Sequence, residues 1–315
     1  MYKRNIYTVM ENKKIAKDVF YAEIRADMGG NCISYTIGGV ELMRRPASPE
    51  ALRNAPNVYG TPLLFPPNRI RGGQFTFEDR RYEFPINEPE RGNSIHGVMS
   101  QTAMDVVEQS ESSVLLRWEA TPESPYLAFP HAFAITVGWN LQSDGLHHTV
   151  TVTNLSPDRM PVGLGFHTAL NASFIPGDAV PEHYRIRLSA TEEIPYDKES
   201  IIPTGERLTS SPLLTLLNGE GYQPQGEYMS RHLLRGPGGA ELIHLPTGRR
   251  ICYDVSDELR YWVLWNGGGT QGFVCPEPQT WMIDAPNQSQ HLEESGFRAL
   301  ESGASLTVKT HLYLV

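Results

Sequence analysis

The chain has 315 residues, enough to bury a substantial core without disulfides or metal ions. Its formal net charge is −9, and no run of Lys or Arg compensates for this locally, which argues against nucleic acid and other polyanions as partners. Residues 1–17 are polar and mixed in charge, and the sequence holds no apolar run of the roughly 18 residues that a membrane span needs. We therefore expect a cytoplasmic protein with no membrane partner.

The predicted elements are mostly short strands, because 28 Gly and 24 Pro favour turns over long helices. In chain order, the sequence first predicts a short helix after Ser48 and a polar turn over 78–81. Strands follow over 133–141 and 146–152, joined by a turn at 143–145, and then over 184–188. A second short helix after Ser211 and a last strand over 306–314 complete the prediction. Both helices begin with Ser-Pro, a capping residue followed by Pro at the first helical position.

The organisation of the chain favours one domain. Pro and Gly are spread evenly, and no internal repeat, low-complexity block or linker divides the sequence. We expect an all-β fold, a β-sandwich with few short helices, formed as a single domain over residues 1–315. The three cysteines, Cys32, Cys252 and Cys275, are an odd number without CxxC spacing, so neither a disulfide framework nor a structural zinc site is predicted.

Two irregular segments, 60–75 and 93–97, carry polar side chains that a structural turn does not need. Their Pro and Gly residues force a non-repetitive backbone path, and loops of this kind on rigid scaffolds commonly hold ligand-contacting groups. Arg69 and Arg71 lie in the first segment and His96 in the second. Taken singly, each arginine is typical of a surface cation, and His96 is typical of a buried structural histidine.

Glu277 and His167 are the strongest candidates for acid–base chemistry later in the chain. Glu277 stands between Pro276 and Pro278 after an apolar run, on a backbone with little freedom, although a solvated turn acid has the same appearance. His167 follows the glycine-containing apolar stretch 160–166, where a core histidine is the alternative.

Aromatic residues precede Glu277 on a predicted strand. We assign Trp262 to the core and hold Trp265 as a candidate for stacking on the apolar face of a ligand.

No metal or cofactor motif accompanies these residues. HExxH, G-x-S-x-G and the Walker A pattern are absent from the sequence, and the glycine run at Gly267-Gly268-Gly269 is only a weak signal for a dinucleotide site. The adjacent pair His147 and His148 falls on a predicted strand, where neighbouring side chains point to opposite faces and cannot hold one ion together. No cofactor and no metal site are predicted.

Taken together, these segments resemble the aldose 1-epimerase (galactose mutarotase) family, in order and spacing over nearly the whole chain. The matching segments are Asn68-Arg69-Ile70 followed by Gly73-Gln74-Phe75, then Asn93 to Gly97, then Asn154-Leu155-Ser156 before His167, and last Glu277 followed by Asp284-Ala285-Pro286-Asn287. Four ordered matches are more specific than any one of them.

The resemblance implies a twisted β-sandwich, called a supersandwich, with an open cleft for a free sugar and no cofactor. It makes Glu277 the catalytic base and His167 the acid, with His96 and Arg69 hydrogen-bonding the sugar; Asn68, Arg71, Glu227 and Trp265 complete the predicted site. Interconverting anomers requires removing the proton of the C1 hydroxyl while protonating the ring oxygen. A carboxylate, with a reference pKa of about 4.3, suits the first task, and a histidine, with a reference pKa of about 6.5, suits the second.

One departure concerns substrate choice. The family usually has an Asp-His pair between the second histidine and the late Glu, whereas residues 227–232 here read Glu-Tyr-Met-Ser-Arg-His. Either Glu227 reaches in from a shifted position or the pocket takes a different sugar, and the segment around Trp281 looks closer to a divergent branch of the family.

The function favoured by the sequence is a mutarotase, an isomerase acting on a free hexose or a related aldose, with a small-molecule sugar as its partner. The missing Asp leaves a non-catalytic carbohydrate-binding or sensing protein as an alternative. An epimerase of phosphorylated hexoses is a third hypothesis, based on the nearby arginines Arg69, Arg71, Arg80 and Arg81. No oligomeric state is predicted.

Overall fold

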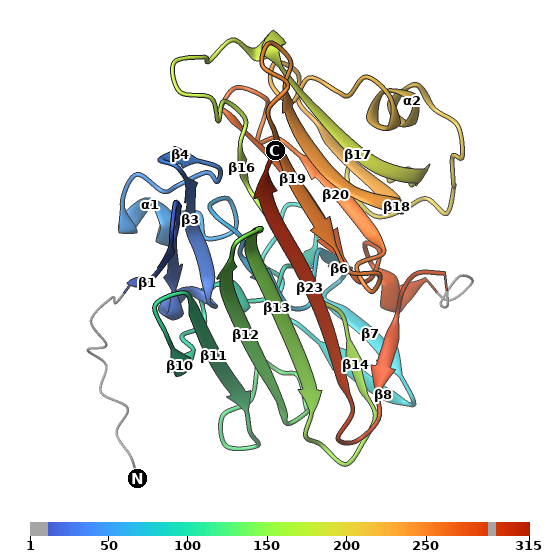
Figure 1. The fold of residues 1–315 in the computed structure, drawn as a ribbon. Helices are drawn as coiled ribbons and strands as arrows, with labels where there is room; N and C mark the ends of the chain where they lie inside the picture. The colour runs from blue at the N-terminus through green and yellow to red at the C-terminus, as the bar shows by residue number, and fades with distance from the viewer. Residues whose placement is uncertain (1–11, 289–293) are drawn as a thin grey trace.

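The computed structural model describes residues 12–288 and 294–315 (Figure 1). It is all-β, with 23 strands and two short α-helices in the described part of the chain. Within those residues, no helix is long and apolar enough to cross a membrane. The three cysteines are buried and unpaired, in agreement with the absence of a predicted disulfide framework.

A 13-stranded sheet forms most of the molecule. Its hydrogen-bonded order is β10-β11-β12-β13-β23-β19-β18-β20-β21-β15-β5, with β16 paired to β21 and β17 paired to β18. The strands are β5 (Leu63–Leu64), β10 (Asp105–Gln109), β11 (Ser113–Ala120), β12 (Phe133–Gln142), β13 (Gly145–Asn154), β15 (Gly165–Phe166), β16 (Leu170–Asn171), β17 (Tyr184–Glu193), β18 (Ser230–His244), β19 (Arg250–Val255), β20 (Tyr261–Trp265), β21 (Phe273–Gln279) and β23 (Ser305–Leu314).

Smaller sheets complete the fold. Four strands form the order β1-β2-β3-β4, with bounds β1 (Asn12–Lys17), β2 (Phe20–Arg25), β3 (Asn31–Ile37) and β4 (Val40–Glu41). Three further pairs join β6 (Arg69–Arg71) to β9 (Asn93–Ile95), β7 (Gln74–Phe77) to β8 (Arg80–Glu83), and β14 (Met160–Val162) to β22 (Arg298–Leu300).

The four-stranded sheet packs beside β10 to β13, and their facing apolar side chains share one core (Figure 1). Ile15 of β1 and Ile24 of β2 are buried in this core with Val137 of β12. Trp139 anchors the contact, since its indole nitrogen donates to the carbonyl of Gly30 over 2.8 Å. The predicted β-sandwich is therefore confirmed.

The local signals in the sequence match the observed elements. Alternating burial along β12 and β13 confirms the hairpin, and the strands over 184–188 and 306–314 are β17 and β23. Both helices are present, α1 (Pro49–Asn54) and α2 (Pro212–Asn218), with the hydroxyls of Ser48 and Ser211 accepting backbone N–H bonds at their N-termini. The turn between β7 and β8 uses Glu78 and Asp79 in the left-handed conformation.

The irregular segment before β9 is tied to the rest of the fold by Asp284. Its buried carboxylate accepts a bond from the backbone N–H of Arg71 over 2.9 Å. The backbone N–H of Asp284 donates to the carbonyl of Arg69, also over 2.9 Å. Asp284 itself has a left-handed backbone (φ 59°) and precedes the 3₁₀ turn η4 (Ala285–Asn287). The late segment of the chain thus fixes β6 in place.

Candidate functional site

A pocket of about 180 Å³ brings together most of the predicted site. This volume is below the roughly 300 to 1,000 Å³ typical of sites for drug-sized ligands, so the pocket suits a smaller ligand. Its lining residues come from β6, β9, β18, β20, β21 and the adjoining loops: Asn68, Arg69, Arg91, Ile95, His96, His167, Ile201, Tyr228, Ser230, Val263, Trp265 and Glu277. Six of these, Asn68, Arg69, His96, His167, Trp265 and Glu277, are residues that the sequence predicts.

Glu277 and His167 lie in contact at the base of the pocket. The Oε1 atom of Glu277 is 3.1 Å from Nε2 of His167, and both side chains are almost fully buried. Glu277 occupies the middle of β21, and His167 directly follows β15, the strand that pairs with β21. A carboxylate and an imidazole are therefore held side by side by neighbouring strands of the main sheet.

Burial shifts the pKa values of this pair in opposite directions. Removal from water raises the pKa of Glu277 well above its usual value, although the Arg69 charge and a bond from the Gln279 amide partly offset the effect. The same cause lowers the pKa of His167 to about 4. Burial therefore favours the neutral form of each member, a protonated carboxyl beside an unprotonated imidazole.

His96 has a defined tautomer and a constrained backbone. Its Nδ1 accepts the backbone N–H of Asn68 over 3.2 Å, so a neutral imidazole carries its proton on Nε2. Burial lowers its pKa well below the usual value, which favours that neutral form. The ring lies edge-on to His167 with centroids 5.6 Å apart, and the residue is in the left-handed conformation at φ 63°.

The chain can bend at His96 because Gly97 follows it. Gly97 also has a positive φ, and a Cβ at this position would collide with the carbonyl of Phe65. Two hydrogen bonds between Asn68 and His96 then hold the two segments together, since the N–H of Asn68 donates to the His96 ring and the N–H of His96 donates to the carbonyl of Asn68 over 3.0 Å. The glycine is therefore required for the position of the imidazole.

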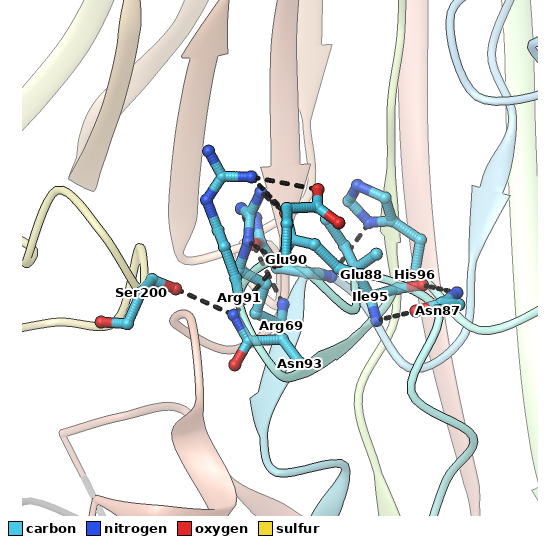
Figure 2. A network of polar contacts seen from close by, with 10 residues as sticks. Arg69, Asn87, Glu88, Glu90, Arg91, Asn93, Ile95, His96 and Ser200 are labelled. Carbon is cyan, nitrogen blue, oxygen red and sulfur yellow. Dashed lines mark hydrogen bonds and ion pairs between the residues drawn. The ribbon is translucent and has the colours of Figure 1, made fainter.

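Arg69 is fixed by a bidentate ion pair with Glu88 (Figure 2). Its Nε and Nη2 atoms donate to the two carboxylate oxygens over 2.8 and 2.7 Å. Asn93 adds a bond to Glu88 over 3.1 Å, and Arg91 lies 3.2 Å from the same carboxylate. Burial alone would raise the pKa of Glu88, but the Arg69 bonds and charge outweigh it and hold that pKa below its usual value.

Trp265 and Val263 form the wall beside Glu277. They share one face of β20, and Val263 lies directly opposite Glu277 in the register with β21. The Trp265 ring packs edge-on to His167, with centroids 5.3 Å apart. Trp262 points to the other face and is fully buried in the main core, as the sequence predicts.

Two further loops cover the pocket and are held by asparagine side chains. Asn266 accepts the N–H of Met229 and donates to the carbonyl of Glu227, which places Tyr228 and Ser230 at the pocket. Asn93 donates to the carbonyl of Ser200 over 2.8 Å, next to Ile201, which also lines it.

Two predicted site residues lie outside this lining. Arg71 is exposed and faces Asp284, 3.8 Å away, because its end of β6 runs toward the η4 turn. Glu227 is exposed and does not line the pocket, and its backbone carbonyl accepts a bond from the Asn266 side chain. The structure therefore gives no support to a Glu227 carboxylate that replaces the missing Asp.

The sequence reasoning did not identify several lining residues, notably Arg91, Ile201, Tyr228, Ser230 and Val263. Val263 had a usable signal, because it is two residues from Trp265 and so shares its strand face. The others lie on loops or at strand ends that reach the pocket only through long-range pairing. The pocket's own acid and imidazoles are not among the three-residue groups spaced to hold a metal ion in the described part of the chain.

Comparison with known proteins gives consistent matches. The sequence profile of the family Aldose 1-epimerase matches residues 21–313. A galactose mutarotase-like protein from Clostridium acetobutylicum has 31% identical residues and a TM-score of 0.91, covering 96% of this chain and 94% of that one. Galactose 1-epimerase from Lactobacillus acidophilus NCFM has 15% identity and a TM-score of 0.75, covering 100% and 97%, which shows a common fold.

The Escherichia coli K12 protein YihR is 25% identical over 198 residues, which are 62% of this chain and 60% of that protein. The match thus spans less than two thirds of that relative's length.

Proposed function

The chain belongs to the aldose 1-epimerase family, and we propose that it interconverts the α and β anomers of a free hexose or related aldose by acid–base ring opening. The observation that carries this proposal is the contact between the Glu277 carboxyl and the His167 imidazole at the base of a small pocket. O1 and O5 are bonded to the same carbon of the sugar, so a base and an acid that act on them must both reach the same end of the ligand, as these two side chains can.

The proton balance suits ring opening. Glu277 as a carboxylate takes the proton of the C1 hydroxyl, the C1–O1 bond becomes a carbonyl, the C1–O5 bond breaks, and His167 gives a proton to O5. The reaction starts from the form in which the proton of the pair is on His167 and ends in the neutral forms that burial favours, with as many protons on the pair as at the start. Rotation about C1–C2 and reversal of these steps then close the ring on either face.

The remaining lining residues suit binding of a neutral polyol. His96 offers an Nε2–H donor, and Arg69 is held beside Glu277 by Glu88. Trp265 supplies an aromatic face beside the catalytic pair, which is the usual partner for the C–H face of a pyranose. We propose that His96, Arg69, Asn68 and Trp265 orient the sugar over Glu277 and His167.

Polarimetry on freshly dissolved pure anomers tests this function. We expect wild-type protein to accelerate equilibration of at least one aldose, and Glu277→Gln to lower kcat by about 10²- to 10⁴-fold, the usual contribution of a positioned base. Glu83→Gln, which changes an exposed acid away from the pocket, is the matched control and should match wild type. Equal rates for wild type and Glu277→Gln would remove Glu277 from the mechanism.

The same assay addresses the two other hypotheses. A non-catalytic sugar-binding protein would give calorimetric binding of an aldose with no acceleration of its mutarotation. A preference for phosphorylated hexoses has less support from the arginines first invoked for it, because of the four only Arg69 lines the pocket and Arg80 and Arg81 line a separate hollow beside Asp158. Comparing kcat/KM for a hexose and its 6-phosphate separates these possibilities.

A further inference from the structure

A cluster of two histidines and one aspartate lies outside the sugar pocket, at the loop between β16 and β17, which is the yellow-green loop at the top of Figure 1. Asp178 belongs to this loop, His183 to the 3₁₀ turn η3 (Pro181–His183), and His244 to the end of β18. One ligand atom from each lies within 4.8 Å of the others.

The geometry of the cluster fits a single ion. Oδ2 of Asp178 is 2.6 Å from Nδ1 of His183 and 2.9 Å from Nε2 of His244. The two imidazoles are inclined at 73° with centroids 5.9 Å apart, so their in-plane lone pairs converge toward the carboxylate. Ligands at about 2.0 to 2.2 Å from zinc lie slightly farther apart than these contacts, so a small outward movement of Asp178 accommodates the ion.

The residues around the cluster can hold its side chains in place for a bound metal ion, just as they do for the hydrogen bonds seen now. His244 is buried, and its other nitrogen, Nδ1, lies 2.7 Å from the hydroxyl of Thr247, a group that can donate or accept. When Nε2 binds a metal, Nδ1 carries the proton and donates to Thr247, which is the outer contact that orients metal-bound histidines. The remaining oxygen of Asp178 accepts the N–H of Val180, which fixes the carboxylate.

A second group, Asp144, His147 and His311, lacks this geometry. Its two imidazoles are stacked at 12° with centroids 4.1 Å apart, so their lone pairs run parallel and do not meet at one point. It therefore serves as a comparison for the first group.

We propose that Asp178, His183 and His244 bind one Zn²⁺ ion, with water at the outer position, and that the ion ties the 172–183 loop to the end of β18. Two imidazoles and one carboxylate are a preferred ligand set for zinc. Partial exposure of His183 and Asp178 leaves room for the water ligand. The sequence shows no metal motif here because its ligands are 66 residues apart along the chain.

Calorimetric titration of chelator-treated full-length protein with Zn²⁺ tests the proposal. We expect one ion per chain, a higher Tm in the presence of zinc, and a loss of affinity of more than about 100-fold in His183→Ala, since even outer contacts of a metal site are worth about 10- to 100-fold. His183 is half-exposed, so this variant should fold. His147→Ala is the matched control and should bind zinc as wild type does.

A second measurement uses Co²⁺ in place of zinc. Visible absorption bands of a four-coordinate nitrogen and oxygen site should appear in wild type and in His147→Ala, and should disappear in His183→Ala. No stoichiometric binding to wild type, or unchanged binding in His183→Ala, would overturn the assignment. Loss of binding in His147→Ala alone would place the ion at the second group and also overturn it.

Discussion

Glu277 is predicted to lower the stability of the fold as the pH rises, even though it is proposed to serve catalysis. Its carboxyl is 2% exposed, and burial raises its pKa in the folded chain well above the usual value. In the unfolded chain the carboxyl ionises at its ordinary pKa of about 4.3. Above that pH the unfolded state releases a proton that the folded state retains, so the stability contributed by this group is complete below about pH 4.3 and declines as the pH rises toward the folded pKa.

The magnitude follows from this linkage. Each pH unit between the unfolded and folded pKa values costs up to about 1.4 kcal/mol, so two units, from pH 5 to 7, cost up to about 2.7 kcal/mol. Replacement by Gln removes the titration and keeps the shape. For a domain of 150–250 residues, about 1 kcal/mol moves Tm by roughly 2 to 4 °C, and a larger chain lies at the lower end. We therefore expect the Tm of Glu277→Gln to rise relative to that of wild type by up to about 5 °C from pH 5 to 7.

Differential scanning calorimetry of both proteins across this range measures the effect. The lowered pKa of His167 also makes stability depend on pH, but burial causes this shift, and the Gln variant keeps His167 buried, so wild type and variant share this contribution. Glu88→Gln is a control for which the pH dependence of stability should have the opposite direction. The pKa of Glu88 is held below its usual value, so its contribution is present above about pH 4.3 and is lost only as the pH falls through the folded pKa. A Tm difference for Glu277→Gln that stays constant or shrinks with rising pH would refute the reasoning.

Three further predictions concern the same site. The acid limb of kcat/KM for mutarotation should fall near pH 4, because below the pKa of His167 the catalytic pair holds two protons and offers no base; a limb near pH 6.5 would contradict this. Glu88→Gln should lower stability at pH 7 by about 2 kcal/mol in urea denaturation and lower kcat/KM at least about 10-fold, since charge-assisted bonds to Arg69 are worth about 1.5 to 3 kcal/mol. Gly97→Ala should lower the free energy of unfolding by more than about 1 to 2 kcal/mol, because the strain of an alanine in the left-handed conformation adds to its collision with the carbonyl of Phe65. An unchanged urea midpoint would show that the bend tolerates a Cβ.

The local elements of the fold could be predicted because their signals lie within a few residues. The alternation over β12 and β13 and the Ser-Pro starts of α1 and α2 need no distant contact to be understood. The order of strands in the main sheet could not be predicted in this way, since β13 pairs with β23 from the far end of the chain. No local pattern specifies such a pairing, because it depends on which faces can be buried together.

The candidate site likewise contains residues that could be predicted from the sequence and residues that could not. Glu277, His167 and His96 could be predicted because the order and spacing of the segments that contain them resemble the aldose 1-epimerase family, although each residue taken singly also suits a structural position. Arg71 resembles Arg69 in sequence, but only tertiary structure shows that Asp284 holds it at the outer end of β6. Tyr228 could not be found, since its place at the pocket depends on bonds from Asn266 across the sheet. That residues 1–315 form one domain stays a prediction.

The place of β23 in the main sheet has a consequence for biosynthesis. In the hydrogen-bonded order, β10 to β13 are joined to β19, β18, β20 and β21 through β23 (Figure 1). The ribosome therefore releases two half-sheets before the strand that links them is available. Until residues 305–314 emerge, β13 and β19 have open edges, which attract other nascent chains and chaperones. Truncating the chain before Ser305 should thus yield aggregates even though every residue of the sugar pocket is retained.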